Sequence, residues 1–454
     1  MRAGRLFWPL VFAAYLVVQM VIRLVTGPAM ELDEAEAFWF GRELALGYNA
    51  QPPLYMWLQW AVFRVTGETL LGIALLKALL LWVAGTVLFA ILAREVDRRQ
   101  AAVAVLALGL LPQVVWESQR ALANSVLAFA LAIIFVALMR GMSGKAGTGR
   151  FAALGFVMGL GTVAKFNFVL VPVGFLLWTY LSYGRVRLPL RGLVVALGVA
   201  AAVVVPVMAW VVLNPVLAGG SVRKLGLAEG GFLVARAEGL VSLAVAAISF
   251  LALAILVLGG LFLARERRAA ERPEVARFLA GGAAAALGVV AVGVILSGAT
   301  EVKDRWLLPI LWPLVPAAVL WLWPVLGARQ RRGLGIGVGL CWIVAMVALP
   351  YASLRDPGYR GADFAPLEAA IAGVDPAPDA VVSDMVWVLG NLALRNPDMP
   401  LVWAGTGTGQ GVLVTLPGKG ATLAERLGRQ AGPGVTHEIR RGNCVTVVEI
   451  LPLL

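Results

Sequence analysis

The sequence consists largely of apolar runs, most about twenty residues long, separated by short polar segments. An α-helix needs about 20 mostly apolar residues to cross the hydrocarbon core of a bilayer. Eleven segments approach or meet this requirement: 6–25, 70–93, 101–116, 122–139, 151–164, 167–183, 192–213, 240–263, 278–297, 306–326 and 333–350. The sequence therefore predicts a polytopic α-helical membrane protein with about eleven transmembrane helices.

The composition supports this prediction. Hydrophobic residues make up 60% of the 454 residues and charged residues only 14%, whereas soluble domains average about 45–50% and about 25%. These proportions exclude a soluble globular enzyme. The abundance of apolar side chains also excludes a disordered chain.

The net charge of +12 comes mainly from basic residues in alternate loops. Such a charge can indicate nucleic-acid binding, but this distribution is typical of the positive-inside bias of membrane proteins. With eleven spans, six basic groups fall on one side: Arg2 and Arg5; Arg94, Arg98 and Arg99; Arg140, Lys145 and Arg150; Arg185, Arg187 and Arg191; Arg265, Arg267, Arg268, Arg272 and Arg277; Arg329, Arg331 and Arg332. We expect a cytoplasmic N-terminus, an uncleaved first span and no nucleic-acid partner.

The opposite side then carries the segments 26–69 and 214–239 and the tail 351–454. The tail is richer in glycine, proline and charge. Its β-like runs at 380–383, 411–416 and 443–450 alternate with helix-like stretches at 363–372, 384–395 and 421–430. We predict a transmembrane domain at 1–350 and a small extracytoplasmic α/β domain at 351–454. The glycine-rich segment 405–411 lacks the lysine of a phosphate loop and is interpreted as a turn.

Residues 31–36, ELDEAE, place four carboxylates just beyond the first span. A solvated acidic turn is the simplest interpretation. The flanking aromatic segments, however, favour short helices along the membrane surface, which would hold the carboxylates at the bilayer edge. A carboxylate there can take a proton from a hydroxyl nucleophile or bind a divalent cation. With only His437, Cys341 and Cys444, the chain offers no histidine-based zinc site and no support for haem or iron–sulfur chemistry.

The order of one span, an outer Asp-Glu pair, a Pro-Pro-Leu-Tyr segment and a second span resembles a known family. Residues 31–82 read ELDEAEAFWFGRELALGYNAQPPLYMWLQWAVFRVTGETLLGIALLKALLLW. They are similar to the bacterial GT-C glycosyltransferases, which include protein O-mannosyltransferase-like enzymes and the aminoarabinose transferase of lipid A. SQRALANSVLAFALAIIFVALMR (118–140), GLGTVAKFNFVLVPVGFLLW (159–178) and KDRWLLPILWPLVPA (303–317) extend the resemblance over roughly residues 1–320. Two positions depart from the common pattern: Gln51 stands where many relatives have histidine, and Asn124 where many have aspartate.

The resemblance implies transfer of a sugar, with inversion, from a polyprenyl-phosphate donor such as an undecaprenyl phosphate sugar. The acceptor would be lipid A, another envelope glycan or a protein, at the periplasmic side of a bacterial inner membrane. Asp33 would be the general base, with Glu34 structural or supporting. No cofactor is required, because the donor carries its own leaving group. A divalent cation at Asp33 or Glu34 stays an open alternative.

The leaving phosphate needs cations or hydrogen-bond donors. Lys165 is the first candidate, followed by Lys303, Arg305 and Lys77. The resemblance also implies substrate contacts at Gln51, Tyr55, Asn124 and Trp306. The simpler interpretation is that Lys165, Lys303 and Arg305 extend to the membrane interface and that Trp306 belongs to the aromatic belt. For Lys77, which lies within a span, the alternative is a buried partner. Arg223 and Lys224 could meet phosphate, although a plain loop is the simpler interpretation.

Two other functions stay open from the sequence. The first is a transporter or flippase of a lipid-linked sugar, although such proteins often contain paired inverted repeats and we find none here. The second is a non-catalytic binder of lipid-linked glycans, which the Asn124 departure keeps open.

Overall fold

The computed structural model describes residues 3–142, 146–184, 188–220, 232–265, 271–374, 378–405 and 411–454. The chain forms two compact units. The first unit comprises Met1–Val17, Ala45–Tyr55 and Lys77–Ala345, and the second comprises Val18–Leu44, Met56–Leu76 and Met346–Leu454. Arg223, Lys224 and most of the glycine-rich turn lie outside the described residues, as do the loop residues Arg2, Lys145, Arg185, Arg187, Arg267 and Arg268.

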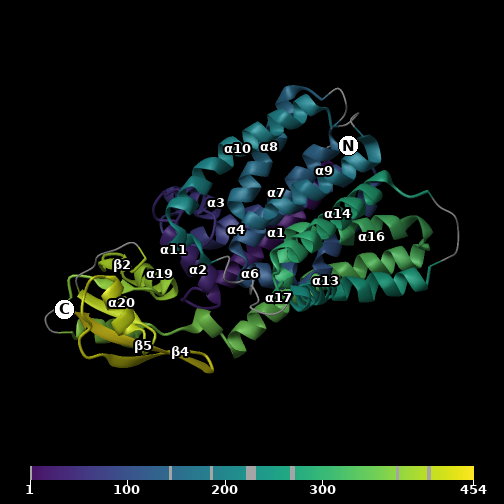
Figure 1. Ribbon diagram of the computed structural model, residues 1–454. Coiled ribbons are helices and arrows are strands. Elements are labelled where there is room, and N and C mark those ends of the chain that lie inside the picture. Colours follow the sequence, from purple (N-terminus) through teal and green to yellow (C-terminus); the bar gives the residue numbers. More distant parts are fainter. Residues whose placement is uncertain are drawn as a thin grey trace. The chain divides into compact units, whose positions relative to one another are not determined.

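The first unit is built of helices joined by loops in its described part (Figure 1). Its elements, some of which run on into the second unit, are α1 (Ala3–Val25), α4 (Leu70–Leu92), α5 (Arg98–Leu106), η1 (Ala107–Leu110), η2 (Gln113–Glu117), α6 (Ser118–Arg120), α7 (Ala123–Arg140), α8 (Thr148–Ala164), η3 (Phe166–Val169), α9 (Leu170–Tyr183), α10 (Leu190–Leu213), α11 (Pro215–Ala218), α13 (Phe232–Leu263), α14 (Glu274–Ser297), η5 (Asp304–Leu307), α15 (Leu308–Leu311), α16 (Leu314–Leu322), η6 (Trp323–Val325) and α17 (Ala328–Arg355).

Eight helices in the described part of the chain are long and apolar enough to cross a membrane, or ten if each of two bent pairs is one span. The bends are 81° between Arg98–Leu110 and Gln113–Arg120, and 52° between Asp304–Leu311 and Leu314–Val325. Pro112 and Pro313 lie at these breaks, where proline cannot donate the backbone hydrogen bond that would continue the helix. The predicted count of eleven is not confirmed, because α8 has only 17 residues.

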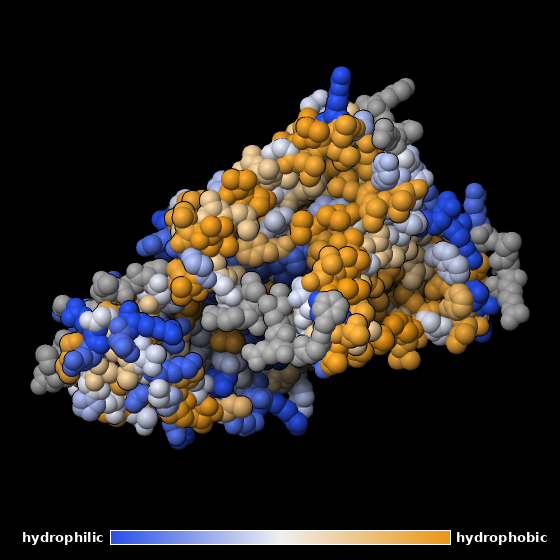
Figure 2. Space-filling model, in the orientation of Figure 1, coloured by the Kyte–Doolittle hydropathy of each residue, from blue (hydrophilic) through white to orange (hydrophobic). Residues whose placement is uncertain are grey.

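The long helices carry apolar side chains on surfaces that no other described part of the protein covers. Leu213 at the end of α10 is 79% exposed, and Leu256 in α13 is 73% exposed. The surface over these helices is accordingly mostly orange in Figure 2. Exposure of so much apolar surface to water would be unfavourable, whereas exposure to lipid tails is not. This is the expected surface of a multi-pass membrane protein.

The second unit combines short helices with one sheet. Its further elements are α2 (Leu32–Phe40), α3 (Leu54–Thr66, whose first two residues belong to the first unit), η7 (Gly358–Gly361), α18 (Ala365–Ala372), β1 (Val381–Ser383), α19 (Val386–Arg395), β2 (Leu401–Trp403), β3 (Gly411–Thr415), α20 (Gly420–Arg426), β4 (Val435–Arg441) and β5 (Cys444–Leu453).

The sheet has the strand order β2-β1-β3-β5-β4. The strands β2, β1 and β3 are parallel, and β5 is antiparallel to both β3 and β4. Val382, Leu413 and Leu451 form its buried core. β4 and β5 form a hairpin whose turn contains Gly442 at φ +55°, a backbone conformation that glycine adopts without steric cost. The predicted α/β character of the tail is confirmed, and β2 and β4 are additional strands.

Candidate active site

Helix α2 carries the acidic segment. Its N-cap residue is Glu31, and Glu34 closes a capping box by accepting a hydrogen bond from the backbone N–H of Glu31 at 3.1 Å. Carboxylates in the first turn are also favoured by the helix dipole. The helix buries Glu34, Ala35, Ala37, Phe38 and Phe40 and leaves Asp33 half-buried. The acidic segment therefore forms the first turn of a helix and is not a solvated acidic turn.

Glu34 is the centre of a buried ion cluster in the second unit. Arg23 donates from Nε to Oε1 and from Nη2 to Oε2 of Glu34, both at 2.8 Å, and Arg360 donates from Nη2 to Oε1 at 2.8 Å. The Glu34 side chain is 3% exposed, and those of both arginines are 6% exposed. Burial lowers the pKa of Arg360 from its ordinary value, and the charge of Glu34 opposes that shift. Both oxygens of Glu34 are thus occupied, which suits a structural anchor.

The tail holds the start of α2 by backbone contacts as well. The backbone N–H of Met30 donates to Oδ1 of Asn391 at 2.7 Å, and Nε1 of Trp387 donates to the carbonyl of Met30 at 2.7 Å. Gly390 lies so close to α2 that an added Cβ would be 2.7 Å from the carbonyl oxygen of Ala35. Helix α19 therefore fixes the position of the acidic helix within the second unit.

Sequence reasoning did not identify Arg360, Trp387 or Asn391. They lie more than 300 residues from α2 along the chain, and nothing local marks them. The only signal was indirect: clustered acidic residues need cations when buried, and Arg23 interrupts the end of the first apolar run.

Asp33 differs from its neighbour. Adjacent helical residues point about 100° apart, so Asp33 does not share the buried position of Glu34. It is half-buried on the same anchored helix. A half-buried carboxylate on an anchored helix can act as a base. The predicted cations and substrate-contacting residues belong to the first unit and are described with it.

Lys165 lies between α8 and η3 in the first unit. Its Nζ donates to Oγ of Ser125 at 2.7 Å, which places it beside the first turn of α7. Asn124 precedes Ser125, and its buried Oδ1 has no hydrogen-bond partner among the described residues. Lys165 and Asn124, selected from separate segments of the sequence, are thus brought to one place.

Lys77 lies close to the same turn. Its side chain in α4 is buried, and Nζ donates to the carbonyl of Ala121 at 3.3 Å. The next residue, Leu122, has φ +68° and is the only described non-glycine residue in the left-handed region. The π-helix η2 precedes it. A left-handed non-glycine residue and a π-helix are both energetically unfavourable unless the surrounding structure stabilises them, and both are frequent at functional sites.

Trp306 joins this region through its backbone. Nδ2 of Asn167 donates to the Trp306 carbonyl at 3.1 Å, and Nε2 of Gln113 donates to Oδ2 of Asp304 at 2.8 Å. We call residues 113–125, 165–167 and 304–306 the polar end of the first unit.

Lys303 and Arg305 flank Asp304 and are exposed, and Lys303 pairs with Glu301 at 3.7 Å.

Gln51 and Tyr55 lie in and after the Pro-Pro turn. Gln51 is half-buried, and its backbone N–H donates to Oδ1 of Asn49 at 2.8 Å. Tyr55 is buried in the first turn of α3. The prolines precede α3, a position in which the missing N–H and fixed φ of proline do not disturb the helix.

Comparison with known proteins identifies the family. Residues 50–210 match the family model "Dolichyl-phosphate-mannose-protein mannosyltransferase". The chain is 31% identical over 409 residues to the lipopolysaccharide core galacturonosyltransferase RgtB of Rhizobium johnstonii, with 86% of this chain and 82% of that protein covered. It is 30% identical over 430 residues to RgtA of the same organism, named for the same activity, with 87% and 81% covered. The chain belongs to the bacterial GT-C glycosyltransferases.

The fold of this GT-C glycosyltransferase has solved counterparts. The crystal structure of ArnT from Cupriavidus metallidurans bound to undecaprenyl phosphate matches with a TM-score of 0.59 at 18% identity, covering 98% of each chain. The apo state of ArnT matches with the same TM-score at 17% identity, covering 99% of this chain and 98% of ArnT. The expected GT-C-like fold is confirmed. The transporter and non-catalytic alternatives are not favoured, because the relatives are named as transferases.

Within the described residues, no group of three or more histidine, cysteine, aspartate or glutamate side chains is placed to hold a metal ion. Both oxygens of Glu34 already accept hydrogen bonds from arginine. Asp33 would therefore have to bind a cation without Glu34 as a partner ligand.

Proposed function

We propose that this GT-C glycosyltransferase transfers galacturonic acid from a polyprenyl-phosphate donor to the core of lipopolysaccharide. The observation that carries this proposal is the similarity to RgtA and RgtB, which extends over more than four-fifths of both relatives. The ArnT structure holds undecaprenyl phosphate, which supports a donor of that class. The reaction takes place at the periplasmic side of a bacterial inner membrane, with the N-terminus of the enzyme in the cytoplasm and the tail 351–454 in the periplasm.

Asp33 acts as the general base in this proposal. It takes the proton from the acceptor hydroxyl as the hydroxyl oxygen bonds to the anomeric carbon of the donor. The bond between that carbon and the phosphate oxygen breaks, and polyprenyl phosphate leaves. Attack from the face opposite the phosphate inverts the anomeric configuration. Glu34 contributes by holding α2 through Arg23 and Arg360.

The polar end of the first unit stabilises the phosphate as it leaves. Lys165 is the principal cation, and Ser125 orients its ammonium group. Lys77, Lys303 and Arg305 add positive charge around the phosphate. Gln51, Tyr55, Asn124 and Trp306 contact the sugar or the acceptor. The reaction requires no cofactor, and a metal chelator is expected to leave it unaffected.

The test is mass spectrometry of envelope lipids and glycans from a strain that lacks this gene. The same strain is complemented with wild type or with Asp33→Asn, and both proteins are quantified in the membrane. We expect lipopolysaccharide core to lose the mass of a hexuronic acid and to regain it only with wild type. Loss of a different sugar would correct the donor assignment, and full restoration by Asp33→Asn would refute the mechanism.

A further inference from the structure

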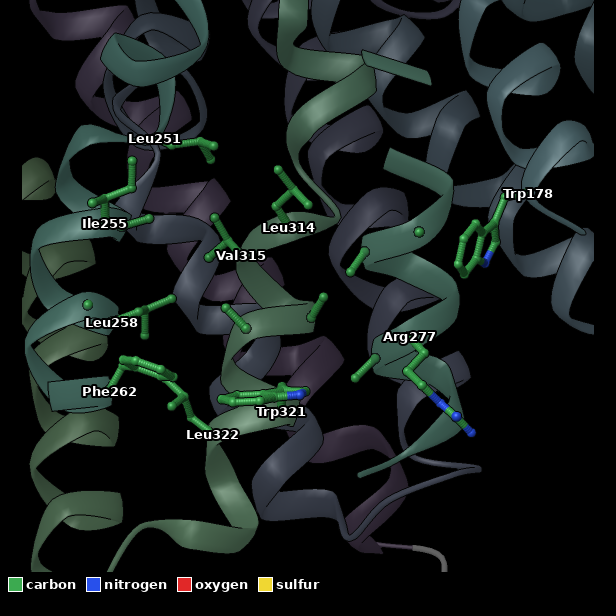
Figure 3. A pocket seen from close by; sticks show the side chains of 17 residues that line it. Trp178, Leu251, Ile255, Leu258, Phe262, Arg277, Leu314, Val315, Trp321 and Leu322 are labelled. Atoms are coloured by element: carbon green, nitrogen blue, oxygen red, sulfur yellow. The ribbon is translucent and has the colours of Figure 1, made fainter. Parts of the chain in front are cut away.

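A groove of about 680 Å³ lies among α9, α13, α14 and α16 in the first unit (Figure 3). Its walls are almost wholly apolar, with Leu251, Ile255 and Leu258 on α13 and Leu314 and Val315 on α16. The volume is in the range of sites for small ligands. It belongs to a part of the protein that the proposed transfer reaction does not use.

The groove exists because two helices present small residues to it. Helix α14 contributes Ala276, Ala280 and Gly281, and α16 contributes Ala317 and Ala318. A Cβ on Gly281 would lie 2.0 Å from the ring of Trp178, so the glycine lets that ring rest against the backbone of α14. Hydrocarbon needs only such apolar walls for binding.

One end of the groove is rich in arginine and aromatic rings. Phe262 and Trp321 stack with their centroids 5.8 Å apart. Arg265 lies 3.5 Å over the Phe262 ring and Arg272 4.2 Å over the Trp321 ring. Arg277 lines the groove from α14 and is exposed. Its guanidinium extends away from the apolar side chains that Figure 3 labels. Arg277 thus lines the groove itself, whereas Arg265 and Arg272 lie over two aromatic rings that line it.

In the described part of the chain, Arg265, Arg272 and Arg277 form no ion pair, and Glu274 of the same region pairs with Arg140. Guanidinium groups bind phosphate in a geometry that fits two of its oxygens. Basic pockets between transmembrane helices are typical sites for anionic lipid headgroups.

We propose that this groove binds an anionic glycerophospholipid, with an acyl chain along α13 and α16 and the phosphate between Arg272 and Arg277. The site is separate from the donor phosphate site. Arg277 lies in the first turn of α14, whereas Asp304–Trp306 of the polar end follow the last turn of this helix. A helix of 24 residues is about 36 Å long, so the two phosphates lie on opposite sides of the membrane.

The test is native mass spectrometry of the purified full-length protein titrated with phosphatidylglycerol, phosphatidylcholine or undecaprenyl phosphate. We expect wild type to prefer phosphatidylglycerol to phosphatidylcholine. The Arg277→Gln variant should weaken phosphatidylglycerol binding by about fivefold, and Arg272→Gln/Arg277→Gln by about thirtyfold. Because Arg272 also donates to the Trp321 carbonyl, size-exclusion chromatography confirms that each variant is folded, and the single variant does not involve that bond.

Two further variants make the test specific. Arg329→Gln/Arg332→Gln removes the same charge from exposed positions outside the groove and should keep wild-type affinity. Ala318→Phe fills the groove without changing its charge and should weaken binding. Equal binding of the two phospholipids, or equal loss in both double variants, would overturn the proposal. Displacement of phosphatidylglycerol by undecaprenyl phosphate at this groove would assign it to the donor instead.

Discussion

Asp33 and Glu34 carry the same functional group, a carboxylate. Their surroundings nevertheless give them different roles. Glu34 pairs with two buried arginines, and both of its oxygens accept hydrogen bonds from them. Asp33 is half-buried one position earlier on the same helix. In the proposed mechanism, substitution of Glu34 acts on stability and substitution of Asp33 acts on transfer.

Glu34→Gln is predicted to destabilise the protein strongly. The variant removes the carboxylate to which both Arg23 and Arg360 donate hydrogen bonds, and breaking a buried ion pair costs about 3–5 kcal/mol. The loss of stability is measured by thermal unfolding, monitored as the fraction of protein that still elutes as a folded species in size-exclusion chromatography. The matched control is Glu368→Gln, which removes the partner of the more exposed Arg395 and should cost about 0–1 kcal/mol. Equal effects of the two variants would show that the cluster does not anchor α2.

Lys165→Gln is predicted to lower kcat by about 10²–10³-fold, the range for loss of one group that stabilises transition-state charge. Lys165→Arg keeps the charge and should retain part of the activity. Lys419→Gln, at an exposed position in the second unit, is the control and should behave as wild type. A wild-type kcat for Lys165→Gln would exclude this lysine from phosphate stabilisation.

Among the elements, α2 depends on α19 for its position. The two helices approach closely because Gly390 lacks a side chain, and Trp387 and Asn391 bind the backbone of Met30. The acidic helix was predictable because its residues are contiguous in sequence. Its support was not, because the residues that hold it come from the tail and meet α2 only in the folded chain.

Gly390→Ala is predicted to destabilise the second unit and to lower transfer. The added Cβ would be 2.7 Å from the Ala35 carbonyl oxygen, and overpacking of this kind costs about 1–3 kcal/mol. Thermal unfolding and the transfer rate are measured together. Gly373→Ala is the control, since its nearest neighbour would be at an ordinary 3.4 Å. Tolerance of the substitution at Gly390 would argue against close packing of α19 on α2.

The sheet shows the same limit of sequence reasoning at the level of strands. β3 was predictable because Val412, Leu413 and Val414 form an apolar run. β4 was not, because VTHEIRR is mostly polar and mostly uncovered. Its strand conformation comes from pairing with β5, an interaction that β4 cannot indicate by its own composition.

For the whole molecule, hydropathy predicts that the chain is a membrane protein. It does not predict the exact number of transmembrane helices where helices are bent or short. The predicted span 101–116 is a pair bent by 81°, and α8 falls short of a full span. Hydropathy averages over a window and does not register a break such as that at Pro112. The membrane orientation depends on loop charges and is testable without any knowledge of the reaction.

Cys444 offers a direct test of that orientation. It is exposed at the start of β5, and the other cysteine, Cys341, lies within α17. In a Cys341→Ser background, a membrane-impermeant maleimide is predicted to label Cys444 from the periplasmic side of spheroplasts. The Cys444→Ser variant is the control for background labelling. Labelling only after the membrane is permeabilised would place the tail in the cytoplasm and reverse the proposed topology.

The central claim is most directly tested by the transfer rate of the purified enzyme. Wild type and Asp33→Asn are assayed with undecaprenyl phosphate-linked galacturonic acid and lipopolysaccharide core acceptor, after their thermal unfolding has been compared. We predict a variant that stays folded and a rate that is lower by about 10²–10⁴-fold, the usual contribution of a general base. A stable Asp33→Asn enzyme that transfers the sugar at the wild-type rate would contradict the assignment of Asp33 as the base.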